Sequence, residues 1–326
     1  MKNSAHLGRA IVAAIALLAG ATAVQAQSSV TAYGRLNLTV ERQKEGNVSK
    51  TVLQNNSSRI GFKGTEDMGG GLKAGFQLEH GFNADTGTQS QTAFWARQSE
   101  VNVGGAFGTV RLGNFTSEAY YATADYISNH NHDTGRSSDA FYAYVGRNTN
   151  KIAYRLPSLG PVTVEGAMSL HETTNGSGKN SYDLAANYQA GPLHLGAGYE
   201  KNDKANQFAV RVFYELGDFG LGAYVQRDEN GYGANYGKRT TTRLSAMYTL
   251  GGLTEFHLNW GHAGNYSDYF KATGIRGDSS ANQFTAGINY KLSKRTKVYG
   301  FYTKVDDKGT IYGDFSSLAV GLRHNF

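Results

Sequence analysis

The sequence predicts an all-β chain that forms a transmembrane antiparallel β-barrel of about 16 strands. Polar and apolar residues alternate with a period of two from residue 29 to the last residue, which is typical of strands. The chain contains 42 Gly, 21 Tyr and 16 Phe, a composition that disfavours helices and suits a pleated surface. Short turns also alternate with long polar connections along the chain, as in membrane barrels.

The first 26 residues have the pattern of a secretory signal peptide. Lys2 and Arg9 precede an apolar run at 10–24, and Val24-Gln25-Ala26 forms a small-x-small cleavage site. The run is too short to favour a retained membrane helix. We therefore expect a signal peptide at 1–26 and a barrel domain at 27–326.

Charge and cysteine content narrow the class further. The chain has no Cys, so an exported protein of this sequence needs another source of stability, such as a closed ladder of hydrogen bonds. Its formal charge of +6 falls to +4 without Lys2 and Arg9, and no Lys/Arg run occurs. Nucleic acid is therefore not an expected partner.

The first strand shows both faces of the predicted wall. One face is apolar and the other polar, with the members Val30, Ala32, Gly34, Leu36, Leu38 and Val40 against Thr31, Tyr33, Arg35, Asn37, Thr39 and Glu41. A soluble sandwich also produces this pattern. Strand lengths near the ~9–11 residues of a membrane strand, and aromatic residues at strand ends, favour the membrane barrel.

The connections fall into two sets. The short turns are expected at 66–71, 104–108, 156–161, 189–192, 216–220, 251–253 and 293–296. The long connections are expected at 43–54, 83–92, 114–145, 172–180, 201–206, 228–238, 264–280 and 306–315. An open sheet edge is not tolerated in a bilayer, so the first and last strands must pair.

Five motifs resemble the general porins of Gram-negative bacteria, specifically the betaproteobacterial branch with anion-selective members. They are SSVTAYG at 28–34, SRIGFKGTED at 58–67, FGTVRLG at 107–113, LSKRT at 292–296 and VGLRHNF at 320–326. The resemblance covers essentially the whole mature chain. The terminal Phe326 is similar to the aromatic end that the outer-membrane assembly machinery reads.

The resemblance implies an outer-membrane homotrimer of water-filled barrels for passive diffusion of small hydrophilic solutes and anions. It also implies that the third external loop, 114–145, folds inward and narrows the pore. No cofactor, metal or catalytic residue is expected. Lipids and lipopolysaccharide of the outer membrane are the expected surroundings. A substrate-specific channel and a loop-mediated adhesive or structural barrel remain the alternatives.

Alternation places several charges in the lumen. Arg59 and Lys63 are opposite in phase to Ile60, and Glu79 is opposite to Leu78. Arg147 also has the inward phase. Basic rings lower the electrostatic cost of anion passage, and a narrow pore lies within the ~8 Å screening length.

The resemblance carries three pore-lining arginines onto Arg59, Arg97 and Arg147, with Glu79 as the facing acid. Strict alternation gives Arg97 the lipid-facing phase of Val101, so either a bulge intervenes or Gln98 is the inward residue.

Candidate acids on the third loop are Glu118, Asp125, Asp133 and Asp139. Asp125 is preferred, although Asn114 stands at the loop entrance where relatives usually have Arg.

Overall fold

The computed structural model describes residues 29–128, 139–174 and 178–326. The proposed signal peptide at 1–26 and the candidate acid Asp133 lie outside the described residues. The strands are β1 (Ser29–Glu45), β2 (Val48–Asn55), β3 (Arg59–Gly69), β4 (Leu72–Asn83), β5 (Thr88–Gln89), β6 (Gln98–Gly105), β7 (Gly108–Asn114), β8 (Lys151–Arg155), β9 (Val162–Ser169), β10 (Ser181–Ala190), β11 (Leu193–Asn202), β12 (Ala205–Leu216), β13 (Phe219–Glu229), β14 (Lys238–Leu250), β15 (Thr254–Ala263), β16 (Ala281–Lys291), β17 (Thr296–Asp307) and β18 (Phe315–Asn325).

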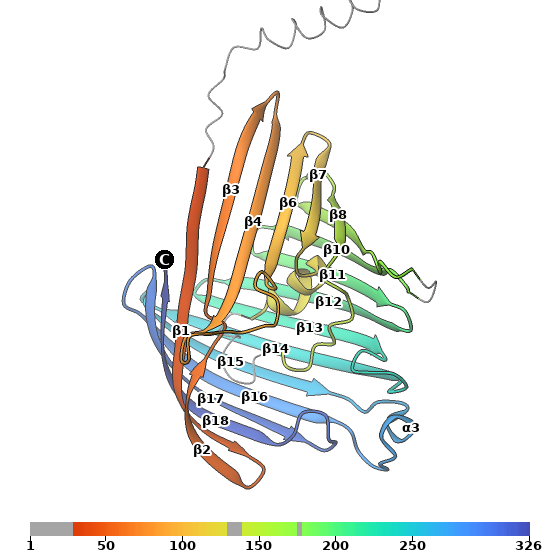
Figure 1. Cartoon of the computed structure of the whole chain (residues 1–326). Helices are drawn as coiled ribbons and strands as arrows, with labels where there is room; N and C mark the ends of the chain where they lie inside the picture. Colours follow the sequence, from red (N-terminus) through yellow and green to blue (C-terminus); the bar gives the residue numbers. More distant parts are fainter. Residues whose placement is uncertain (1–28, 129–138, 175–177) are drawn as a thin grey trace, which may run out of the picture.

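The strands close into one antiparallel barrel (Figure 1). β2 and β3 form a single wall strand interrupted at 56–58, and the two-residue β5 lies in a loop, so 16 strands make up the wall. β1 pairs with β18, from Arg35 opposite Asn325 to Glu45 opposite Phe315. This pairing removes the open edge, as the sequence predicts.

Alternating exposure along the strands separates the two faces of the wall. In β12, the buried residues Gln207, Ala209 and Arg211 point inward, and Phe208 and Val210 are exposed on the outer face. The same alternation leaves large apolar side chains exposed around the outside of the barrel. A wall with polar groups inside and apolar groups outside is the arrangement of a membrane barrel.

An irregularity between β2 and β3 exchanges inward-facing and outward-facing positions along this strand. Leu38 pairs with Asn55 and Arg35 pairs with Arg59, so the second strand carries one extra residue across this gap. Ser57 has a φ of 57°, and the side chain of Asn37 donates to the Asn56 carbonyl at 3.1 Å. A β-bulge of this kind re-aims the residues that follow it. Arg59 therefore points into the lumen.

The connections at one end of the barrel are all short, as predicted, but two connections at the other end are shorter than expected. β1 continues to Glu45 and β2 starts at Val48, so the predicted long connection at 43–54 is wrong. Asp203 and Lys204 alone separate β11 from β12, so the prediction at 201–206 is also wrong. Charged residues continue both hairpins beyond their apolar bands, which made the strand ends resemble loops.

The longest connection, residues 115–150 between β7 and β8, is called the third loop below. Its described part contains α2 (Glu118–Tyr120) and the π-helical turn η1 (Tyr121–Asp125). Another short helix, α3 (Tyr269–Thr273), lies between β15 and β16. No helix in the described ranges has the length and hydropathy of a membrane span.

The described part of the third loop packs inside the barrel. α2 and η1 lie against β10, β11 and β12. The inward positions of β11 at the contact are Gly196 and Gly198, and an added Cβ on Gly196 would lie 2.0 Å from the Ala122 carbonyl oxygen. Two small residues on the inner face of β11 therefore make room for the loop.

Candidate functional site

The loop that contains β5 positions Arg97. β5 pairs with the end of β4, and Asn114 donates to the carbonyls of Trp95 and Ala96 at 3.2 and 2.9 Å. Arg97 lies one residue before β6 begins. Its side chain passes over Gly81, where an added Cβ would lie 3.0 Å from the Arg97 Cδ. Because Arg97 lies outside the strand, the alternation of side chains in β6 does not decide where it points. Arg97 reaches the lumen without a bulge in β6.

Glu79 on β4 is the centre of the basic side of the site. The Nε of Arg97 donates to its Oε1 at 2.6 Å, and the Nε of Arg59 lies 3.8 Å from the same oxygen. The hydroxyl of Tyr33 donates to Glu79 Oε2 at 3.0 Å. Both arginine side chains are about one quarter exposed, whereas Glu79 is nearly buried. The arginines, rather than the acid, present charge to the lumen.

Two further arginines complete this side. Arg35 on β1 lies directly opposite Arg59 on β3, and Arg323 on β18 lies opposite Asn37 on β1. Barrel closure between β1 and β18 brings these residues together from the two ends of the chain. Both have the inward phase in the sequence, so alternation marks them as lumen residues, but it does not distinguish them from the other inward charges.

The opposite side of the site belongs to the third loop. Ser117 caps α2 by accepting a hydrogen bond from the backbone of Ala119 at 3.1 Å. The hydroxyl of Tyr120 donates to Asp139 Oδ2 at 2.8 Å and lies 3.3 Å from Asp125 Oδ1. Tyr144 also donates to Asp139. Burial, followed by the Asp139 charge, raises the pKa of Tyr120 and Tyr144 well above the usual value. Both phenols therefore remain protonated donors.

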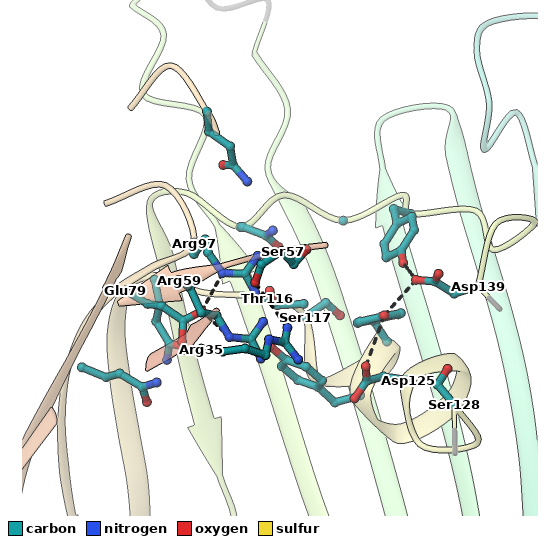
Figure 2. A pocket seen from close by; sticks show the side chains of 18 of the residues that line it. Arg35, Ser57, Arg59, Glu79, Arg97, Thr116, Ser117, Asp125, Ser128 and Asp139 are labelled. Carbon is teal, nitrogen blue, oxygen red and sulfur yellow. Dashed lines mark hydrogen bonds and ion pairs between the residues drawn. The ribbon is translucent and has the colours of Figure 1, made fainter. Parts of the chain in front are cut away.

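These two sides enclose a lumen cavity of about 850 Å³. Figure 2 shows Arg35, Arg59, Arg97 and Glu79 on one side and Asp125, Ser128 and Asp139 on the other. The lining also includes Tyr120, Tyr121, Tyr144, Glu200 and Arg323. Five residues selected from the sequence meet here: Arg59, Arg97, Glu79, Asp125 and Asp139. The candidate acid Glu118 does not line the cavity.

Arg147 and Lys63 do not line this cavity. The Nη2 of Arg147 donates to the backbone carbonyls of Ser169 and Lys179, so its guanidinium lies on the β9–β10 side of the wall. Lys63 lies over the ring of Tyr33 at 5.3 Å. It lines a separate space of about 300 Å³, toward the short-turn end. Alternation predicts which face a side chain occupies but not its height or its direction along that face.

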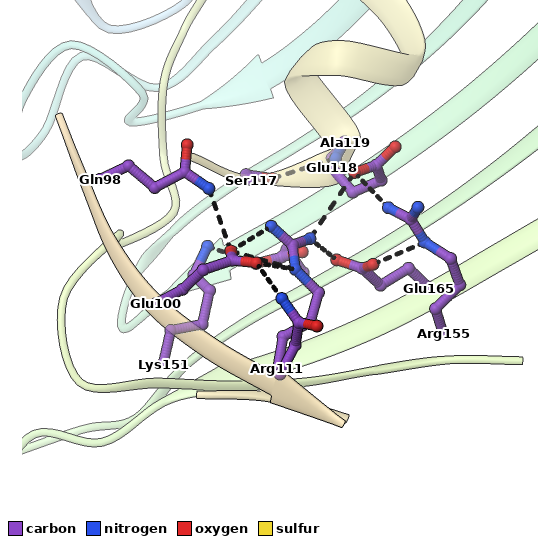
Figure 3. A network of polar contacts seen from close by, with 11 residues as sticks. Gln98, Glu100, Arg111, Ser117, Glu118, Ala119, Lys151, Arg155 and Glu165 are labelled. Carbon is purple, nitrogen blue, oxygen red and sulfur yellow. Dashed lines mark hydrogen bonds and ion pairs between the residues drawn. The ribbon is translucent and has the colours of Figure 1, made fainter. Parts of the chain in front are cut away.

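A second network fixes the start of the third loop to the wall (Figure 3). Glu118 on α2 accepts from Arg155 at 2.9 Å, and Arg155 also donates to Glu165 at 2.9 Å. Arg111 donates to Glu100 and to Glu165 at 2.7 and 2.8 Å. Because these partners lie on β6 to β9, the network joins the loop to four strands at once.

The aromatic ring of Phe115 reinforces the same attachment. Phe115 is buried, with the guanidinium of Arg111 at 4.1 Å and the ammonium of Lys151 at 5.4 Å from its ring centroid. Lys151 forms an ion pair with Asp183 at 3.0 Å. Cations above an aromatic face attract it electrostatically. Lys151 and Arg155 therefore hold the wall and loop together.

A closed 16-strand barrel with an apolar outer face, a polar lumen and an inward-packed loop defines a membrane channel. The family model of Gram-negative porins matches residues 13–310, and the chain belongs to this family. It is an outer-membrane porin: a water-filled channel for passive diffusion of small hydrophilic solutes, and not an enzyme.

Three comparisons show the extent of the similarity. The chain is 29% identical to outer membrane porin protein 32 of Delftia acidovorans over 360 residues, covering 96% of this chain and 98% of that one. The anion-selective porin from Comamonas acidovorans has a TM-score of 0.73 and 26% identity, covering 92% of this chain and all of that one. The trimer form of OmpT from Vibrio cholerae has a TM-score of 0.68 and 15% identity, with coverages of 92% and 99%.

Proposed function

We propose that this porin favours anions, and that the selectivity arises in the lumen cavity between Glu79 and the third loop. The observation that carries the proposal is the cluster of Arg35, Arg59, Arg97 and Arg323 on one side of that cavity. Guanidinium groups never deprotonate at physiological pH, and basic rings lower the cost of anion passage.

A simple count of charge does not support selectivity, because four acids also line the cavity. Three of these acids are less exposed than Arg59 and Arg97, whose side chains are about one quarter exposed. Arg35 is itself buried, and Asp125 is half-buried. Glu200 and Asp139 are almost fully buried, and Glu79 is paired with Arg97. Glu200 accepts from the backbone of Val145 at 3.1 Å, and Asp139 accepts from two phenols. Carboxylates whose charge is spread into hydrogen bonds act on passing ions less than the partly exposed guanidinium groups of Arg59 and Arg97 do.

The relatives support the same proposal. The anion-selective porin from Comamonas acidovorans shares this fold over nearly the whole chain. We therefore assign the constriction to Arg35, Arg59, Arg97, Arg323 and Glu79 on the wall and Asp125 on the loop. Arg147 and Lys63, which the sequence pattern also suggested, are not part of this assignment.

Reversal potentials in planar bilayers under a KCl gradient test the proposal. Wild type should favour chloride over potassium, and Arg59→Ala and Arg97→Ala should each lower the chloride-to-potassium permeability ratio. Arg147→Ala is the matched control, because its guanidinium lies outside the cavity. Preference of wild type for potassium, or equal effects of Arg147→Ala and Arg59→Ala, would contradict the assignment.

We further propose a homotrimer in contact with outer-membrane lipids and lipopolysaccharide. Exposed apolar side chains surround the barrel, and Arg42, Lys44 and Lys304 lie on its exposed outer face near the loop end. The OmpT trimer form from Vibrio cholerae supports the assembly by fold alone. Light scattering in detergent should give three times the monomer mass, and a monomeric particle would overturn the trimer.

Export by a signal peptide at 1–26 completes the proposal. Intact mass of the protein isolated from membranes should then correspond to a chain that starts at Gln27. A mass that includes residues 1–26 would contradict it.

A further inference from the structure

Arg243 on β14 carries a buried guanidinium, and none of the described carboxylates is its partner. It is 0% exposed and points inward, beneath the third loop. Its Nη2 donates to Gln283 Oε1 at 2.9 Å, but no described residue offers its Nε or Nη1 a well-aligned acceptor. No carboxylate in the described part of the chain forms an ion pair with it.

Arg239, another inward arginine of the same strand, shows how protein groups alone can surround a buried guanidinium. Arg239 lies 3.6 Å from Asp228 and donates to the Phe141 carbonyl at 3.1 Å and to the Tyr312 hydroxyl. Two further tyrosine rings face its guanidinium at 4.4 and 4.5 Å. Arg239 therefore has a nearby acid, two acceptors and aromatic faces, although its Nε also lacks a well-aligned acceptor. Arg243 has one amide oxygen and the neighbouring Tyr224 phenol, and no acid among the described residues.

The residues around Arg243 add further unused polar groups. Tyr224 lies directly opposite Arg243 in the β13–β14 register and is buried, and its hydroxyl lies beside the Arg243 guanidinium without a well-aligned hydrogen bond to any described residue. Asn259 is a diagonal neighbour on β15, and neither polar atom of its buried amide has a hydrogen-bond partner among the described residues. Hydrogen-bond donors therefore outnumber acceptors around this guanidinium.

The local shape lets these groups face one another. Gly261 lies opposite Arg243 on β15, and an added Cβ there would lie 2.6 Å from the guanidinium carbon. Glycine at this position is what allows the guanidinium to lie flat over β15. The ring of Phe141, from the third loop, lies 5.7 Å from the guanidinium and covers it.

A buried, unpaired charge is costly, and arginine cannot escape the cost by losing its proton. A water molecule would satisfy a donor but would leave the charge uncompensated, and a cation would add to it. We propose that a small inorganic anion of the halide class binds beside Arg243, between Tyr224 and Asn259. This site lies outside the lumen cavity and beneath the third loop, and is separate from the selectivity of the pore.

Bromide replaces chloride and scatters anomalously, so the wild-type protein can be tested directly. Crystals soaked in bromide should show an anomalous peak within hydrogen-bond distance of Arg243 Nε or Nη1 and near Tyr224 Oη. Electron density for water alone at that position, with no anomalous signal, would overturn the proposal.

Thermal unfolding in detergent provides the second readout. The Tm of wild type should be higher by about 2 °C or more in bromide or chloride than in gluconate at equal ionic strength, because gluconate is too large for an enclosed site. Arg243→Met should remove this difference, and Tyr224→Phe should reduce it. Arg239→Gln should lower the Tm but keep the difference. Equal Tm values of wild type in all three salts would overturn the site, even if Arg243→Met does not fold.

Discussion

The Nε of Arg97 lies 2.6 Å from Glu79 Oε1, and this contact joins a loop residue to a wall residue at the basic side of the lumen. Arg59 approaches the same oxygen at 3.8 Å. One carboxylate therefore holds two arginines at the cavity and offsets part of their charge.

Glu79→Gln should increase the preference for chloride. A unit charge ~7 Å away from a passing ion changes its energy by about RT at a water-like dielectric. Because the change has opposite sign for chloride and potassium, the permeability ratio should rise by about sevenfold. Reversal potentials measure the ratio. Glu66→Gln, near the short-turn end of β3, is the control that should leave the ratio unchanged. A fall in chloride preference in Glu79→Gln would show that Glu79 orders the arginines more than it neutralises them.

Gly198→Val should displace the third loop. An added Cβ on Gly198 would lie 2.7 Å from the Ala119 carbonyl oxygen, so α2 must move away from β11 and into the lumen. We expect a lower single-channel conductance and a loss of about 1–3 kcal/mol of stability from overpacking. Gly166→Ala is the control, because its nearest neighbour would lie at 3.8 Å. Unchanged conductance in Gly198→Val would mean that the loop does not narrow the pore at this point.

Gln226→Leu should loosen the return segment of the third loop. Gln226 accepts from the backbone nitrogen of Ala143 at 2.8 Å and donates to its carbonyl at 3.1 Å. Losing both bonds leaves two buried backbone groups unsatisfied, at a cost of about 1–3 kcal/mol each. Limited proteolysis should then cut the third loop faster than in wild type. Gln189→Leu, at an exposed position of β10, should not change the cleavage rate.

Glu118→Gln should change how stability depends on pH. Burial raises the pKa of Glu118 above its usual range, although Arg155 and Arg111 act in the opposite direction. The folded state then binds the proton more tightly than the unfolded state, so this group makes stability fall as pH rises from the ordinary carboxyl pKa through the raised one.

Removing the titrating group should therefore flatten the profile of Tm against pH in that window. Thermal unfolding between about pH 4 and 8 measures it, and Glu215→Gln at an exposed position is the control. A profile steeper than that of wild type would show that the Arg155 and Arg111 charges dominate over burial.

The sequence by itself determined the barrel, its approximate strand number, its two faces and the inward phase of Arg59, Glu79 and Lys63. These properties follow from a local rule, because successive side chains of a strand point to opposite faces wherever the strand lies. The resemblance added Arg97, for which the phase argument failed because Arg97 precedes β6.

Only the tertiary structure decided which inward residues share one level of the lumen. Arg35 and Arg323 meet Arg59 because the first and last strands pair in one particular register, and that register depends on closure of the whole wall. Arg147 has the right phase, but its guanidinium turns toward backbone carbonyls beside β9 and β10. Residues distant in the chain come together through strand register and loop packing, and alternation within one strand contains no information about either.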